Sequence, residues 1–203
     1  MNLYLTRHGQ TVWNVEKRMQ GKNNSLLTEL GVQQAIQFGK YMKNVQLSCI
    51  YSSSSLRALH TAELICGERN IPIIASNELM EIGLGEWEGM TFCEVEKQYP
   101  EQFYNFWNQP EKYNRPDGES FEVLRQRVST KIEEIAQLHS NETVWVVAHG
   151  MALKTLYTYF QKQSIHDIAY SPRIESACVC MVEKHAGVWN VMRWNEVITE
   201  ISN

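Results

Sequence analysis

The sequence predicts an α/β fold: a three-layer sandwich with a mostly parallel central sheet, helices on both faces and a lid made of helices and loops. Short apolar segments alternate with amphipathic segments along most of the 203 residues, which is typical of strands joined by crossover helices. The segment TVWVVAHG at 143–150 is apolar almost throughout, which indicates a strand buried on both faces. An aromatic-rich segment at 86–118 interrupts this alternation and is interpreted as the lid insertion.

Hydrophobic periodicity assigns the individual elements. We expect helices at 28–43, 55–67, 120–139 and from 150 to about 160. We expect strands at 2–6, 47–51, 71–75 and 143–150, followed by two late strands at 176–183 and 187–194 that turn at Lys184–Gly187.

Two of the expected helices carry more detailed signals. The helix at 120–139 is the clearest, because Ser120 can cap its start and apolar residues then recur at helical spacing. In the helix at 28–43 we expect a buried face made of Ala35, Ile36, Gly39 and Met42.

Composition favours one domain over residues 1–203 with a substantial core, since 43% of the residues are hydrophobic and 21% are charged. The net charge of −4 argues against a general nucleic-acid or membrane-surface binder, although a local arginine cluster could still bind an anionic substrate. Five cysteines at irregular spacings, without a CxxC pair, are typical of core residues in a reducing compartment. We therefore expect a soluble cytoplasmic protein without a membrane span.

Reactive side chains follow three of the expected strands. Arg7 and His8 come directly after the first strand, Arg57 follows the serine run at 52–55, and His149 ends the buried strand. In a parallel sheet these ends meet at one edge, where ligands bind. Each feature alone also has an ordinary structural role. Together, two guanidiniums, two imidazoles and adjacent helix N-termini favour a tetrahedral dianion such as phosphate.

Five segments together resemble one known family. They are LYLTRHGQTVWN at 3–14, MQG at 19–21, YSSSSLRALHTA at 51–62, ELMEIGLGEWEG at 78–89 and VVAHG at 146–150. In this order they resemble the histidine phosphatase superfamily, the phosphoglycerate-mutase-like group. RPDGESFEVLRQRV at 115–128 also resembles a segment of its broad-specificity phosphatase branch.

This resemblance implies catalytic roles for five residues. His8 would be the nucleophile that becomes phosphohistidine, and Glu81 would be the proton donor. Arg7, Arg57 and His149 would hold the phosphoryl oxygens, so that no metal ion and no cofactor is needed.

The resemblance also implies a set of residues that assist binding. Asn14 and the backbone of Gly150 would contact phosphate, and Gln20 and Gly21 would line the pocket. Three acids near Glu81 could compete with it for the role of proton donor: Glu78, Glu86 and Glu88.

The chain departs from the family pattern in two places. Gln10 follows Arg-His-Gly where many relatives have Glu, and a polar group of similar size should be tolerated there. The stretch NNSLLT at 23–28 lacks the Asp and Pro that relatives often carry before Leu-Thr. We therefore expect a looser loop at the edge of the pocket.

The expected function is a metal-independent phosphomonoester hydrolase acting on phosphorylated small molecules with partly apolar leaving groups. Residues 90–120 contain three cations and six acids, a balance unsuited to the doubly phosphorylated cofactor of a mutase. Phosphoglycerate mutase and α-ribazole phosphatase are the alternatives within the superfamily, and a non-catalytic phospholigand-binding domain is the alternative outside catalysis. The aromatic residues of 86–118 could contact substrate, form a small satellite core, or do both.

Overall fold

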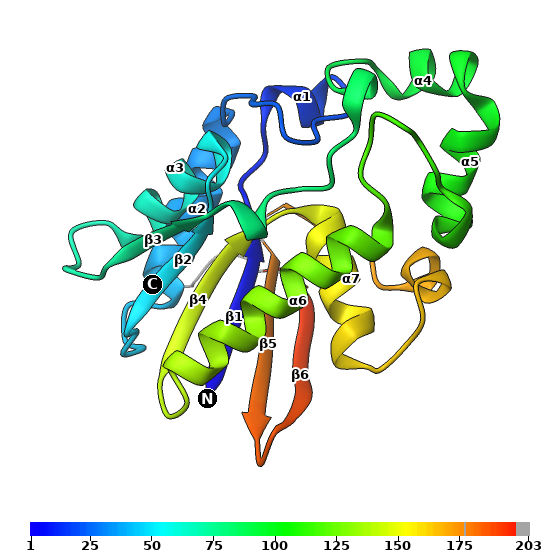
Figure 1. Ribbon diagram of the computed structural model, residues 1–203. Helices are drawn as coiled ribbons and strands as arrows, with labels where there is room; N and C mark the ends of the chain where they lie inside the picture. The colour runs from blue at the N-terminus through cyan, green and yellow to red at the C-terminus, as the bar shows by residue number, and fades with distance from the viewer. Residues whose placement is uncertain (177, 198–203) are drawn as a thin grey trace.

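The computed structural model describes residues 1–176 and 178–197 and contains one six-stranded sheet. The strand order is β3-β2-β4-β1-β5-β6, as Figure 1 shows. Neighbouring strands pair in parallel from β3 to β1, whereas β5 pairs antiparallel with both β1 and β6. The prediction of a mostly parallel sheet is confirmed. The bounds are β1 Asn2–Arg7, β2 Cys49–Ser53, β3 Ile73–Ser76, β4 Thr143–Ala148, β5 Cys178–His185 and β6 Val188–Val197.

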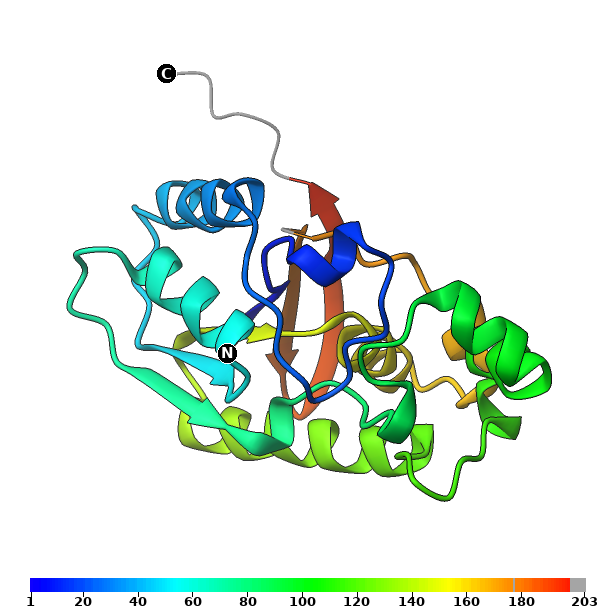
Figure 2. The same ribbon diagram turned by 90° about the horizontal axis from the view of Figure 1, so that it is seen from above.

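Helices cover both faces of the sheet, which confirms the three-layer prediction. Figure 2 shows α2 and α3 on one side of the sheet and α6 on the other, where α7 packs beside it. The α-helices are α1 Val12–Val15, α2 Glu29–Tyr41, α3 Leu56–Cys66, α4 Phe92–Gln98, α5 Pro100–Asn108, α6 Phe121–Leu138 and α7 Gly150–Phe160. Short 3₁₀ helices lie at Asn77–Leu79, Gly85–Trp87, Pro110–Lys112 and His166–Tyr170. No helix of the described residues is long and apolar enough to cross a membrane.

Strand β4 has side chains in both hydrophobic cores. Trp145 and Val147 pack in the core under α2 and α3, while Val144 and Val146 pack in the core under α6 and α7. Because successive strand residues point to opposite faces, a strand covered on both sides must be apolar at every position. The continuous apolar run at 143–148 therefore follows from the position of β4 inside the sheet.

The buried face of α2 differs from the prediction at Ile36. The buried stripe consists of Ala35, Phe38 and Met42, and Ile36 is 40% exposed on the outer side. The stripe follows the i, i+3 and i+7 spacing of one helix face, and Ile36 falls beside it. Gly39 lies at the contact with α3, where an added Cβ would come 2.7 Å from the carbonyl oxygen of Ile65.

The C-terminal hairpin is confirmed with shifted bounds. Its turn is shorter than the predicted Lys184–Gly187, because β5 continues to His185 and the chain reverses at Ala186 and Gly187. Both turn residues have positive φ, 48° and 80°, the geometry that joins two antiparallel strands tightly. Ala177, inside the predicted strand at 176–183, lies outside the described residues.

The aromatic segment forms helices α4 and α5 together with a packed aromatic cluster. The ring of Trp87 lies 5.6 to 6.5 Å from the rings of four neighbours: Tyr99, Phe103, Phe106 and Tyr113. The guanidinium of Arg115 covers the Trp87 ring at 4.8 Å and the Tyr99 ring at 4.6 Å. The segment is therefore packed as predicted, although its buried rings are continuous with the core under α6 and α7 and do not form a separate satellite core.

The contact between Gly39 and Ile65 predicts the sign of a stability change. In an exposed helix interior, Gly→Ala stabilises by roughly 0.5–1 kcal/mol. We expect Gly39→Ala to destabilise the protein by about 1–3 kcal/mol, because the new methyl group would overlap the α3 backbone. Urea unfolding measures the change, with Gln33→Ala on the exposed face of α2 as control. A stabilised Gly39→Ala variant would show that the helices are not so closely packed.

Candidate active site

The register of β1 and β4 brings two predicted histidines together. Arg7 pairs with Ala148, so the next residues, His8 and His149, leave the sheet side by side. The backbone N–H of His8 continues the ladder by donating to the Ala148 carbonyl at 3.1 Å. Their ring centroids are 5.2 Å apart. Sheet geometry therefore explains why residues 141 positions apart in the sequence share one site.

The hydrogen bonds of His8 fix its tautomer. Nδ1 lies 2.8 Å from the carbonyl oxygen of Gly9, which can only accept, so Nδ1 carries the proton. Nε2 accepts from Nε of Arg57 at 3.2 Å. Burial, reinforced by the positive charges of Arg57 and Arg7, lowers the pKa of His8 well below its usual 6.5. The ring is therefore neutral, and Nε2 is unprotonated, with a lone pair that can attack once the Arg57 N–H releases it.

Arg57 connects the two histidines to the loop at 21–23. Its side chain is only 2% exposed, and it donates to the carbonyls of Asn23 at 2.5 Å and Gly21 at 2.8 Å. A further N–H donates to Nδ1 of His149 at 3.1 Å. Burial lowers the pKa of Arg57 to about 10, which still leaves it charged at neutral pH. Its guanidinium is therefore a fixed positive charge beside Nε2 of His8.

Arg7 supplies an unsatisfied donor. One terminal nitrogen donates to the carbonyl of Ile174 at 3.0 Å, while the buried Nε has no partner among the described residues. Burial lowers the pKa of Arg7 from its usual value. A buried guanidinium N–H without a partner is costly unless an anion binds there. Arg7 therefore presents a donor suited to an anion.

His149 lies behind Arg57 and is fully buried. Its Nδ1 accepts from Arg57, so Nε2 carries the proton and donates to Oγ of Ser53 at 2.8 Å. Burial, followed by the charge of Arg57, lowers its pKa well below 6.5. Part of the serine run is buried beside this histidine: Ser53 ends β2, and Oγ of Ser55, the residue before α3, lies 3.4 Å from Nε2 of His149.

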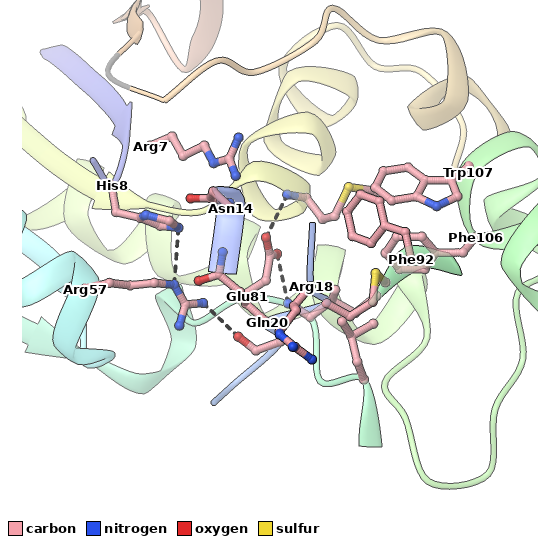
Figure 3. Close-up of a pocket in the computed structure, with 15 residues that line it drawn as sticks. Arg7, His8, Asn14, Arg18, Gln20, Arg57, Glu81, Phe92, Phe106 and Trp107 are labelled. Atoms are coloured by element: carbon pink, nitrogen blue, oxygen red, sulfur yellow. Dashed lines mark hydrogen bonds between the residues drawn. The ribbon is translucent and has the colours of Figure 1, made fainter. Parts of the chain in front are cut away.

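A cavity of about 90 Å³ opens beside His8. Figure 3 shows His8, Arg7 and Arg57 on one side, the aromatic rings on the other, and Glu81 between them. Seven of the predicted site residues line the cavity: Arg7, His8, Asn14, Gln20, Gly21, Arg57 and Glu81. His149 and Gly150 do not line it, and a direct contact of either with phosphate stays a prediction. Gly150 sits close behind, since an added Cβ would lie 3.7 Å from Nε of Arg7.

The sequence did not single out several cavity-lining residues. Arg18 directly precedes the MQG motif, Met19 is its first residue, and Ile82 and Leu84 follow Glu81 inside another motif, so sequence proximity was their only signal. Met151 reaches the cavity from the first turn of α7. Three aromatic residues of the predicted lid also line it: Phe92, Phe106 and Trp107. The aromatic segment therefore both packs internally and lines the cavity, and its contact with substrate stays a prediction.

Glu81 places its carboxylate at the N-terminus of α7. Oε2 accepts from the backbone N–H of Met151 at 3.0 Å, and Oε1 accepts from those of Ala152 at 3.2 Å and Ile82 at 2.9 Å. Free N–H groups and the helix dipole favour an acidic group at this position. The three competing acids do not line the cavity: Glu78 bonds to Ser76, Glu86 to Arg115, and Glu88 to backbone N–H groups.

Glu88 instead secures the loop that carries Gln20 and Gly21. Its carboxylate accepts from the N–H groups of Lys22, Asn23 and Leu84 at 2.9 to 3.1 Å. Gly21 has φ of 51°, and an added Cβ would lie 2.2 Å from the Glu88 carboxylate. Position 21 therefore requires glycine for both conformation and space.

The loop at 23–28 is held by several hydrogen bonds, contrary to the expectation that it is loose. Asn24 accepts from the N–H of Leu56 at 2.9 Å, and Ser25 accepts from that of Trp13 at 3.0 Å. Gly9, the glycine of the Arg-His-Gly motif, contacts α2 and does not line the cavity. An added Cβ would lie 2.4 Å from the carbonyl oxygen of Gly31, so Gly9 allows α2 to approach the turn after β1.

The arrangement has the components of phosphoryl transfer. An unprotonated imidazole nitrogen faces the cavity, two guanidiniums can stabilise phosphoryl oxygens, and a carboxyl group lies opposite. Within residues 1–176 and 178–197, no group of three or more His, Cys, Asp or Glu side chains is placed to hold a metal ion.

Comparison with known proteins agrees with this chemistry. A family model described as "Histidine phosphatase superfamily (branch 1)" matches residues 3–197. The chain is 31% identical over 191 residues to "Uncharacterized phosphatase PhoE" of Bacillus subtilis, covering 94% of this chain and 92% of that protein. It is 34% identical over 157 residues to "Phosphoserine phosphatase 1" of Hydrogenobacter thermophilus, covering 77% and 74%. Other matched proteins are named probable phosphoglycerate mutases.

A solved structure agrees over nearly the whole fold. "Bacillus stearothermophilus YhfR" superposes with a TM-score of 0.95 at 42% identity, covering 97% of this chain and 98% of that one.

The hydrogen bonds predict opposite neutral tautomers for the two histidines. We expect His8 to carry its proton on Nδ1 and His149 on Nε2, and both rings to remain neutral at pH 5.5. Two-dimensional NMR of ¹⁵N-labelled imidazoles distinguishes these forms directly. Because the folded pKa values lie below 6.5, the unfolded chain binds more protons below that pH. Stability should therefore fall as the pH drops below about 6.5. Protonated rings at pH 5.5 would contradict the assignment.

Proposed function

The chain belongs to the histidine phosphatase superfamily, and we propose that it is a metal-independent phosphomonoester hydrolase that acts through a phosphohistidine at His8. One observation carries this proposal: His8 is neutral and buried, its Nε2 is unprotonated, and it lines a cavity that two guanidiniums also line. The names of the phosphatase relatives support the same reaction class. Phosphorylated small molecules are the proposed substrates.

Substrate binding begins with the anionic phosphoryl group. The unpartnered Nε of Arg7 and the charge of Arg57 attract it to the side of the cavity that holds His8. Asn14 and Gln20 line the same cavity, and their side-chain amide N–H groups can donate to phosphoryl oxygens. These groups are ordered before substrate arrives, so little reorganisation is needed when charge develops on the phosphoryl oxygens.

In the first chemical step, Nε2 of His8 attacks phosphorus and the bond from phosphorus to the ester oxygen breaks. The leaving oxygen takes a proton from Glu81 in its acid form and departs as an alcohol. Oε1 of Glu81 accepts two N–H bonds and Oε2 accepts one. Oε2 therefore has a free lone-pair position for this proton.

In the second step, water attacks the phosphorus of phosphohistidine and gives its proton to the Glu81 carboxylate. The bond between phosphorus and Nε2 breaks, inorganic phosphate leaves, and His8 returns to its neutral tautomer. The Gly9 carbonyl keeps the Nδ1 proton in place throughout, so that Nε2 regains its lone pair.

The cavity wall opposite His8 favours leaving groups that are partly apolar. Phe92, Phe106 and Trp107 form this wall together with four aliphatic or thioether side chains: Met19, Ile82, Leu84 and Met151. Apolar contact of this kind excludes water and stabilises aromatic or aliphatic leaving groups. The wall therefore supports a phosphatase of broad specificity.

The cysteines support a reducing compartment. All five are free, and four of them are buried as core residues: Cys49, Cys66, Cys178 and Cys180. We accordingly place the enzyme in the cytoplasm.

A substrate panel tests the reaction class. We expect release of inorganic phosphate from p-nitrophenyl phosphate with kcat of about 1–100 s⁻¹, unchanged by EDTA, because protein side chains supply all the proposed charges. 3-Phosphoglycerate and an α-ribazole phosphate serve as comparison substrates. Loss of activity in chelator would contradict the metal-independent mechanism, and efficient interconversion of phosphoglycerates would identify a mutase instead.

The nucleophile is tested by substitution and trapping. We expect His8→Ala to reduce turnover by at least about 1,000-fold, since no other described group can replace the attacking nitrogen. Rapid quenching should trap phosphate on the wild-type protein in an acid-labile, base-stable form, with mass spectrometry locating it at His8. His185→Ala, in the exposed end of β5, is the matched control and should keep full activity. A His8→Ala protein with normal turnover would refute the proposed chemistry.

A further inference from the structure

Arg127 and Glu119 form a bidentate ion pair beside the site. Nε and one terminal nitrogen of Arg127 lie 2.6 and 2.7 Å from the two carboxylate oxygens of Glu119. Both side chains are largely buried, with 17% and 9% exposed. Neither lines the cavity, so neither is placed to touch substrate. Among the ion pairs formed by the described residues, this pair is one of the least exposed to solvent.

The remaining N–H groups of Arg127 bind the main chain of Glu81 and of residues that precede it. They donate to three carbonyl oxygens: those of Glu78 at 2.9 Å, Met80 at 2.6 Å and Glu81 at 2.9 Å. Arg127 thus contacts Glu81 itself through its backbone. A planar guanidinium suits this task, because its donors are fixed relative to one another.

Glu119 holds the chain on the other side of Glu81. Its carboxylate accepts from the N–H of Gly83 at 3.0 Å, and its own N–H donates to the Gly83 carbonyl at 2.7 Å. Together the pair bonds to residues on both sides of position 81.

Glu81 needs such support because no regular element fixes it. Residues 80–84 follow a short 3₁₀ helix and belong to neither a helix nor a strand. Main-chain carbonyls in such a segment need partners when they are buried. The carboxylate is held at α7 by Met151 and Ala152, whereas the backbone is held from α6 by Arg127.

We propose that Arg127 and Glu119 are positioning residues for the proton donor Glu81. The pair sets where the Glu81 backbone lies, and through it the distance from Oε2 to the leaving oxygen of a substrate bound at His8. This inference rests on the proposed function, in which Glu81 protonates the leaving group. Displacement of a general acid by a fraction of an ångström weakens proton transfer without removing the nucleophile.

Leaving groups of different basicity separate positioning from simple structural support. A basic leaving oxygen needs the Glu81 proton, whereas dinitrophenolate leaves without it. kcat/KM covers the steps up to formation of phosphohistidine and excludes its hydrolysis. A defect in proton donation therefore lowers kcat/KM for basic leaving groups selectively, whereas a general loss of structure lowers it for all of them.

The experiment measures kcat/KM for a series of aryl phosphates from phenyl to 2,4-dinitrophenyl phosphate. We expect Arg127→Lys to lower the value for phenyl phosphate about 10- to 100-fold, as part of the roughly 10²- to 10⁴-fold that a general acid contributes. The value for 2,4-dinitrophenyl phosphate should change less than about threefold. Glu119→Gln keeps the side-chain shape. It should likewise lower kcat/KM more for phenyl phosphate than for 2,4-dinitrophenyl phosphate.

The matched control is Arg125→Lys, two residues earlier on α6, because the side chain of Arg125 makes no hydrogen bond or ion pair with the described residues. Arg125→Lys should leave kcat/KM unchanged for every aryl phosphate in the series. In a Glu81→Gln background, Arg127→Lys should add less than about a twofold effect, since the donor is already absent. Thermal melts of each variant confirm that folded protein is compared.

An equal loss of kcat/KM for all aryl phosphates in both Arg127→Lys and Glu119→Gln would overturn the positioning role while leaving the proposed function intact. If the effects of Arg127→Lys and Glu81→Gln on kcat/KM were fully additive, the positioning role would be overturned as well. A wild-type protein that hydrolyses none of the series would instead refute the proposed function, and the positioning role with it.

Discussion

The buried guanidinium of Arg57 is the contact on which the rest of the site depends. It bonds to His8, to His149 and to the carbonyls of the loop at 21–23, so it joins two strand ends to the pocket edge. Removing a cation from water is costly unless its donors are satisfied. Here carbonyl oxygens and imidazole nitrogens satisfy them, and these partners are mostly neutral. The charge of Arg57 therefore remains available to a bound anion.

This arrangement divides the work between the two arginines. Most of the Arg57 donors are already used by the protein, whereas Arg7 keeps a buried N–H without a partner. We therefore propose that Arg57 mainly orients His8 and keeps it neutral, and that Arg7 is the more available donor to a phosphoryl oxygen. His149 acts in this structure as an acceptor for Arg57. Its expected contact with phosphate would require a proton on Nδ1 and a shift of that hydrogen bond.

The sequence predicted the features that depend on strand order and local pattern. The alternation of elements and the apolar run at 143–148 led to the sheet, and the sheet led to Arg7 and His8 at one edge. Glu81 was assigned by resemblance alone, because no periodicity marks an irregular segment. Features that depend on contacts between distant residues were missed. Gly9 and Gly31 touch across the turn after β1, and Arg127 reaches Glu81 from another helix. Neither contact leaves a signal in local spacing.

The double role of the aromatic cluster constrains how leaving-group preference could change. Phe106 lines the cavity but is 2% exposed and packs on Tyr113 and Phe121, so truncating it would cost about 3–5 kcal/mol of stability. Phe92 and Trp107 line the same wall and are only partly buried. Substitutions at these two positions alter the wall with less loss of packing. The cavity wall is therefore more easily changed at Phe92 and Trp107, while the packing of the core requires Phe106.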